Sequence, residues 1–300
     1  MFKKSNSGAY ILFTTAMLIY STIGIFRKFI PLSSAALAFA RGLIGGVFLI
    51  VWMLLTGKSL KLGIGRKKMG LLCLTGVALG ANWLLLFEAY NYTSVAVATL
   101  CYYMEPTILI LLSPLLFKEK LTAKKLACAA ASLLGMTLVS GVFGSEGNTS
   151  LIGVLLGLAA AVLYAVVIIL KKKNPVENAY GKTVVQLFVS AAVLTPYLLL
   201  TETPGSISLD TTAIIMLLVV CIVHTGIAYA MHFGSVQKLP SQTMAVLSYI
   251  DPVLAVILAA VILREPMSVA EMIGAVLILG AAVISEVSFH KQEDSTSKSF

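Results

Sequence analysis

Two acidic residues, each followed by a proline, lie in the middle of long hydrophobic stretches. The stretch CYYMEPTILILL contains Glu105 and Pro106, and LSYIDPVLAVIL contains Asp251 and Pro252. A charge at the centre of a membrane helix costs ~2.5–3.5 kcal/mol on insertion scales. We expect each proline to kink its helix, because it removes a backbone N–H and frees a carbonyl one turn earlier. The pairs favour a hydrated, ligand-lined helix in which the acid binds a cation or a proton; a neutral or ion-paired structural acid is the alternative.

The composition indicates the setting of these acids. The 300 residues are 59% hydrophobic and 12% charged, too apolar for a soluble domain. Apolar runs of about 18–22 residues recur, and each can cross about 30 Å of hydrocarbon as a helix. We therefore expect an all-α membrane protein with ten transmembrane helices. Their ranges are near 8–27, 33–55, 69–89, 94–116, 123–142, 151–170, 181–200, 212–233, 241–263 and 269–287.

The net charge of +9 comes from lysines and arginines that gather in a few loops. The loops at 58–68 and 118–125 fall on the same side of the membrane as the N-terminus in the ten-span arrangement. The positive-inside rule then predicts a multi-pass protein of the cell membrane with both termini in the cytoplasm. We expect these charges to orient the protein in an anionic leaflet of the lipid bilayer, and we expect no nucleic-acid binding.

The two acid–proline pairs belong to an internal repeat. When YMEPTILILLSPLLFKEKLT is set over YIDPVLAVILAAVILREPMS, Tyr103 falls on Tyr249 and Glu105 falls on Asp251. Each unit has five spans, so the second copy enters the membrane from the opposite side. We expect a first five-helix repeat at 1–145 and a second, inverted repeat with a short cytoplasmic tail at 146–300, around a central cavity.

The repeat predicts where the acids lie. Glu105 and Asp251 are each about ten residues into their spans, which is about 15 Å at 1.5 Å per residue. That depth is near the midplane of the bilayer, where the axis relating the repeats also passes. We therefore expect both acids to face the central cavity, to bind substrate and to couple transport to protons, since acids inside membranes are functional candidates by default.

Aromatic residues accompany the acids. Tyr20, Tyr103, Tyr164 and Tyr249 lie deep in their spans and pair through the repeat, and Trp83 adds an indole. Such rings can form a wall against an organic substrate and make cation–π contacts. Packing within the helix bundle is the alternative for these five residues.

Two further residues have two interpretations each. Arg41, in the second span, can bind a carboxylate or phosphate of a substrate; alternatively it forms a fixed salt bridge with Glu88 or Glu105, or extends towards a surface. His224, in the eighth span, can relay protons or pack between helices. Metal-ligand spacing, a phosphate-binding glycine loop and a nucleophile elbow are absent from the sequence. We therefore expect no metal, no cofactor and no catalytic residue.

Two five-span halves, each with a mid-span proline and an acid near the end of the same helix (FKEKLT, LREPMS), resemble the EamA-type proteins of the drug/metabolite transporter superfamily. The resemblance covers essentially the whole chain. It implies ten helices, cytoplasmic termini and a central cavity that opens alternately to the two sides. It also implies a carrier of small organic solutes in a bacterial inner membrane.

The residues and the resemblance together predict a secondary active transporter and not an enzyme. Its substrate would be an amino acid or amine-like metabolite, zwitterionic or cationic, exchanged for protons that Glu105 and Asp251 bind in one state and release in another. Small residues in the fifth and tenth spans would pack the bundle or pair two copies as a homodimer. The alternative is a non-transporting membrane sensor or assembly protein that binds a ligand in the same cavity.

Overall fold

The computed structural model describes residues 7–117, 122–139, 150–202, 209–236, 238–239 and 241–297. Over these ranges the chain forms helices and no strand, which confirms the all-α fold class. Seven of the described helices are long and apolar enough to cross a membrane, and two shorter apolar helices follow them. Leucines on the outside, such as Leu55 and Leu200 at 81% and 87% exposure, suit a surface solvated by lipid.

Each of the ten expected spans coincides with helix over its described residues, apart from the short breaks described below. The first repeat contains α1 (Ser7–Ser21), α2 (Ile23–Lys28), α3 (Ser34–Leu55), α4 (Arg66–Tyr92), α5 (Val95–Tyr102), α6 (Glu105–Phe117) and α7 (Ala123–Val139). The second contains α8 (Leu151–Lys173), α9 (Ala179–Thr201), α10 (Thr211–Leu218), the π-helix η1 (Val219–Ile227), α11 (Ala228–Val236), α12 (Ser241–Ser248), α13 (Ile250–Ile262) and α14 (Val269–Ser297).

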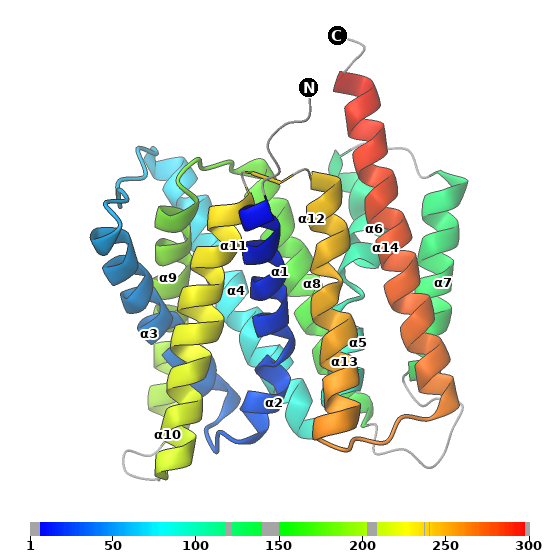
Figure 1. The fold of residues 1–300 in the computed structure, drawn as a ribbon, viewed down its shortest axis with the longest axis horizontal. Coiled ribbons are helices and arrows are strands. Elements are labelled where there is room, and N and C mark those ends of the chain that lie inside the picture. The colour runs from blue at the N-terminus through cyan, green and yellow to red at the C-terminus, as the bar shows by residue number, and fades with distance from the viewer. Residues whose placement is uncertain are drawn as a thin grey trace.

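The two repeats are inverted relative to each other. In Figure 1, α5 lies below α6, whereas their counterparts α12 and α13 lie in the opposite order. The helix pairs in contact also obey a two-fold relation: α3 packs on α9 and α7 on α14, while α4 on α8 is matched by α1 on α11. Both chain ends lie at one end of the bundle, which we call the terminal end; the opposite end is the α2 end (Figure 1).

The fourth and ninth spans are interrupted part-way through the bundle. α5 ends at Tyr102 and α6 begins at Glu105; α12 ends at Ser248 and α13 begins at Ile250. At the first break, the N–H of Met104 bonds to the carbonyl of Cys101 at 3.1 Å, a tightened final turn.

The prolines therefore act differently from the expectation that they kink a continuous helix. Pro106 and Pro252 lie in the first turn of the second half-helix, where an N–H has no intrahelical acceptor and its loss costs little. The interruption comes before each acid. Glu105 and Asp251 consequently stand at the start of a half-helix, where the positive end of the helix dipole stabilises a carboxylate.

Small residues allow α7 and α14 to touch backbone to backbone. A Cβ placed on Gly135 would lie 2.7 Å from the carbonyl oxygen of Gly274, and the reverse distance is 2.5 Å. The glycines of the fifth and tenth spans thus pack the two repeats against each other. Pairing of two copies of the chain through these spans stays a prediction.

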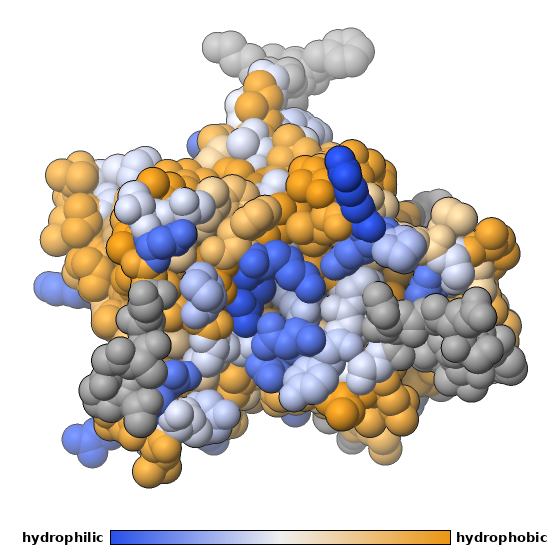
Figure 2. All heavy atoms as spheres, turned by 90° about the horizontal axis from the view of Figure 1, so that it is seen from below, coloured by the Kyte–Doolittle hydropathy of each residue, from blue (hydrophilic) through white to orange (hydrophobic). Residues whose placement is uncertain are grey.

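The face at the α2 end has a polar middle. Figure 2 shows hydrophilic side chains gathered at the centre of this face and hydrophobic residues around its edge. That distribution matches a bundle whose flanks face lipid while its axis carries the polar groups.

Candidate functional site

A cavity of about 430 Å³ lies between the two repeats. Helices from both repeats form its walls, including α1, α4, α5 and α6 from the first and α8, α9, α11 and α13 from the second. All the residues that the sequence singles out for substrate binding line this cavity. They are Glu105, Asp251, Tyr20, Tyr103, Tyr164, Tyr249, Trp83 and Arg41.

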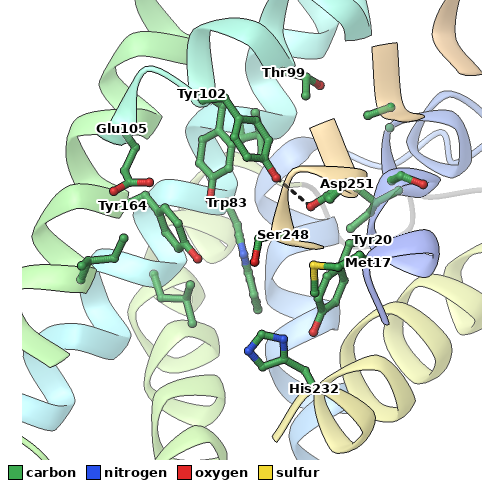
Figure 3. A pocket seen from close by; sticks show the side chains of 18 of the residues that line it. Met17, Tyr20, Trp83, Thr99, Tyr102, Glu105, Tyr164, His232, Ser248 and Asp251 are labelled. Carbon is green, nitrogen blue, oxygen red and sulfur yellow. Dashed lines mark hydrogen bonds between the residues drawn. The ribbon is translucent and has the colours of Figure 1, made fainter. Parts of the chain in front are cut away.

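The two acids face the cavity from opposite sides. In Figure 3, Glu105 lies beside Tyr164 on one wall and Asp251 lies near Tyr20 on the other, with Trp83 between them. Glu105 is 9% exposed, and Asp251 is partly buried. Both carboxylates therefore line one chamber, where a bound cation would experience the charge of both.

A hydrogen bond links the repeats at this chamber. The hydroxyl of Tyr103 donates to Oδ2 of Asp251 at 2.8 Å (Figure 3). Tyr103 comes just before Glu105 in the first repeat, so the bond joins one broken helix to the first turn of the other. It fixes the direction in which the Asp251 carboxylate points into the cavity.

Aromatic rings form much of the remaining wall. The ring of Tyr102 stands edge-on to that of Tyr103, with centroids 5.6 Å apart, and lies 5.3 Å from that of Tyr164. Tyr20 and Tyr229 form a second edge-to-face pair at 5.9 Å on the opposite side. Aromatic faces carry negative potential, so the wall is suited to an organic cation with apolar groups around its charge.

Arg41 also lines the cavity and is 4% exposed. Its Nε donates to Oγ1 of Thr225 at 3.1 Å, and the guanidinium carbon lies 4.0 Å from the centroid of the Trp83 ring. The carboxylate of Glu88 accepts from Asn91 at 3.0 Å, and over the described residues no ion pair joins it to Arg41. Arg41 thus presents a cation in the cavity wall, where it can meet a substrate carboxylate.

The π-helix η1 sets the position of Thr225. The Oγ1 atom of Thr225 donates to the carbonyl of Val220, five residues earlier, at 3.2 Å. A π turn holds an additional residue and rotates the side chains after it, which brings Thr225 against Arg41.

His224, the third residue predicted for proton coupling, lies behind the cavity wall. It is 1% exposed, its Nε2 is 2.9 Å from Oγ1 of Thr22, and its ring packs on Phe26 at 5.0 Å. It is not among the residues that line the cavity. A role in coupling would therefore need a route through Thr22, and it stays a prediction.

The cavity includes residues outside the predicted set. One of them is Gln186, a buried residue whose side-chain Nε2 has no hydrogen-bond partner among the described residues. Another is Lys171, an exposed residue in the last turn of α8, at the terminal end of the bundle. Others are Tyr102, Tyr229, His232 and Ser248. An amide in an otherwise apolar span is a signal that could have found Gln186 from the sequence. Among the described residues, no cluster of three His, Cys, Asp or Glu side chains could hold a metal ion.

Known proteins resemble this chain over most of its length. The uncharacterized transporter YxxF of Bacillus subtilis (strain 168) is 27% identical over 286 residues, which cover 95% of this chain and 91% of that protein. A probable amino-acid metabolite efflux pump of Salmonella typhimurium (strain LT2) is 29% identical over 188 residues, covering 59% of this chain and 62% of the pump.

A solved crystal structure has a similar fold, with a TM-score of 0.66 at 23% identity, covering 93% of this chain and 96% of that one. The sequence profile of the EamA-like transporter family matches twice, at residues 7–141 and at residues 151–286. The two matches correspond to the two halves of the bundle around the cavity. The chain belongs to the EamA-like transporter family.

Proposed function

We propose that this transporter is a secondary active carrier that moves a small amine-bearing metabolite, zwitterionic or cationic, through the cavity by alternating access and in exchange for protons. The observation that carries the proposal is that Glu105 and Asp251, the mirrored acids, line one cavity between two inverted repeats. Each acid begins a half-helix, the arrangement that carriers use for ligand sites at the middle of the membrane.

The chemistry of the wall supports the substrate class. Two carboxylates and a set of aromatic rings attract a cation, and Arg41 offers a partner for a carboxylate on the same molecule. The similarity to a probable amino-acid metabolite efflux pump points to the same class of solute. The positive loops support a cytoplasmic location for the terminal end of the bundle and for both chain ends.

The two acids would carry the protons. A substrate cation and a proton compete for the same carboxylates, so loading one expels the other, which is the basis of exchange. His224 is proposed as a third coupling residue behind the wall. The variant His224→Gln would then lose proton-driven flux and keep substrate binding.

The test is flux driven by a pH gradient in proteoliposomes, with a panel of amino acids and amines selected first by thermal shift. Glu105→Gln and Asp251→Asn should abolish coupling, whereas Glu177→Gln, at an exposed loop position, should leave it unchanged. Coupling that survives in both cavity variants would remove the proton role. Binding without any flux in the unaltered protein would favour a membrane sensor instead.

A further inference from the structure

A cluster of polar contacts at the α2 end joins the two repeats. Arg27 and Lys28 end α2, Asn91 lies near the end of α4, and Glu265 lies in the turn between α13 and α14. The guanidinium of Arg27 donates to Oδ1 of Asn91 at 3.2 Å and to the carbonyl of Ile30 at 2.9 Å. Its Nε has no hydrogen-bond partner among the described residues.

The carboxylate of Glu265 caps a helix of the other repeat. Its Oε1 accepts from the N–H of Val95 at 3.1 Å and its Oε2 from the N–H of Ala96 at 3.3 Å. The ammonium of Lys28 lies 3.9 Å from Oε1. The first N–H groups of a helix lack intrahelical acceptors, and the positive end of the helix dipole adds to the attraction. Glu265 therefore ties the end of α13 to the start of α5 and to α2.

The backbone that delivers Glu265 is strained. Arg264 has a φ of 53°, in the left-handed region that is usually left to glycine. The N–H of Glu265 bonds back to the carbonyl of Ala259 at 3.3 Å, so the chain folds back over the last turn of α13 at this point. Arg264 adopts this conformation although it is not a glycine. The conformation directs the side chain of the next residue, Glu265, onto α5.

The tied helices meet where the cavity approaches the α2 end. Tyr90 is among the residues that line the central cavity and also among those that line a small pocket of about 250 Å³ with Arg27, Lys28 and Asn91, and Lys28 donates to its carbonyl at 3.0 Å. At the same level, a Cβ on Gly24 would overlap the side chain of Val95, so α2 and α5 are in direct contact. At the opposite end, the cavity wall includes the exposed Lys171.

We propose that Glu265 is a gating residue of the transport cycle. Its carboxylate, the start of α5 and Lys28 form a latch, here called the Glu265 latch, which keeps the cavity closed at the α2 end and must open before solute can pass there. This inference rests on the proposed alternating-access function. It adds a positioning role for a residue that lies outside the substrate cavity.

The latch can be tested without measuring transport. The four native cysteines, Cys73, Cys101, Cys128 and Cys221, are replaced by alanine, and Thr99→Cys is introduced as a reporter. Thr99 lines the cavity (Figure 3), and its Oγ1 lies 3.4 Å from the hydroxyl of Tyr90. A membrane-impermeant maleimide is added in membrane vesicles of each orientation, so that each end of the bundle is probed separately.

The reporter should react slowly from the α2 end when the latch is intact. Glu265→Gln should speed that reaction by about 5- to 30-fold, the ratio that corresponds to losing a capping carboxylate worth one to two kcal/mol. Glu271→Gln is the matched control, because Glu271 lies close to the same connection, in the first turn of α14, and accepts from the N–H of Ser268 at 2.6 Å. The reaction from the terminal end should slow as the α2 end opens.

Lys28→Gln provides a second measurement, because it leaves the cap on α5 in place and removes the ion pair together with the ammonium that donates to the carbonyl of Tyr90. It should give a smaller acceleration in the same direction, and it decides the question if Glu265→Gln fails to fold. The proposal is overturned if the Glu265 and Glu271 variants react at equal rates, or if the reporter already reacts rapidly from the α2 end. Equal labelling rates of the Glu265 and Glu271 variants, with proton-coupled flux in the unaltered protein, would contradict the latch and leave the proposed function standing. Faster labelling of the Glu265 variant, without flux in the unaltered protein, would contradict the proposed function and leave the closing contact standing.

Discussion

The hydroxyl of Tyr103 donates a 2.8 Å hydrogen bond to the carboxylate of Asp251. Tyr103 lies two residues before Glu105, so a residue beside the acid of the first repeat orients the acid of the second. The bond runs between the two interrupted spans and joins the first repeat to the second. A movement that separates the spans must break it or carry both residues together. The orientation of the Asp251 carboxylate is thus linked to the relative position of the repeats.

Removing this hydroxyl should weaken substrate binding. Tyr103→Phe keeps the ring and deletes the donor, so the Asp251 carboxylate loses its fixed direction. We expect KM to rise about fivefold, equivalent to about 1 kcal/mol for one hydrogen bond, with little change in maximal flux. Tyr164→Phe, in the same cavity, is the control and should change KM by less than twofold. Equal effects of the two variants would show that the bond has no special part in binding.

Arg41 should distinguish zwitterions from simple amines. Arg41→Gln removes the cation from the cavity wall, so a solute with both an amine and a carboxylate should lose about tenfold or more in apparent affinity. A matching amine without the carboxylate should be affected less than twofold. Competition between paired solutes in proteoliposomes measures the difference. Thr225→Val is the control, because it removes the partner of Nε and keeps the guanidinium. A similar loss for both solutes would assign Arg41 a packing role.

The contact between α7 and α14 should tolerate no additional atom at its centre. Gly135→Ala places a Cβ 2.7 Å from the carbonyl oxygen of Gly274. That oxygen belongs to the backbone, so it cannot avoid the Cβ by a change of side-chain rotamer. We expect a loss of ~1–3 kcal/mol in stability, as for other overpacked interfaces, visible as a lower thermal unfolding temperature in detergent. Gly280→Ala, on α14 with no heavy atom within 4 Å of its Cβ, should be neutral. Equal unfolding temperatures would mean that the helices can move apart freely.

The left-handed residue Arg264 should be sensitive to the shape of its side chain. Arg264→Val puts a β-branched residue at a φ of 53° and should destabilise the protein by ~1–3 kcal/mol. Arg264→Gly should keep or slightly raise the stability, because glycine adopts this conformation without strain. Unfolding midpoints of the two variants in detergent measure the contrast, and matching midpoints would contradict it.

Much of the architecture could be predicted because few backbone conformations satisfy all hydrogen-bonding groups within a lipid bilayer. Long apolar runs must form helices to satisfy their backbone groups, and the acid–proline repeat pairs the halves in register. The register also brought Glu105 and Asp251 to one cavity, since symmetry-related positions in inverted repeats approach a common axis. Glu119, the sequence counterpart of Glu265, lies outside the described residues.

What the pattern could not predict depends on local backbone geometry. The prolines suggested bent helices, but the breaks occur before each acid, because capping and dipole effects favour an acid and a proline in a first turn. The bond from Tyr103 to Asp251 depends on one side-chain rotamer. The π turn that carries Thr225 to Arg41 has no sequence signature in periodicity, since it differs from an α turn by a single residue.

That π turn bears on the relative free energies of the two forms of the empty carrier. Under the proposed alternating access, two identical halves would give inward-facing and outward-facing forms that are related by a two-fold rotation and equal in free energy. The second repeat contains η1, whereas its counterpart α4 is a continuous α-helix, so the two forms would differ in free energy. The empty carrier would then rest preferentially in one form. The polypeptide itself would set the side from which solute is first captured, before any gradient acts.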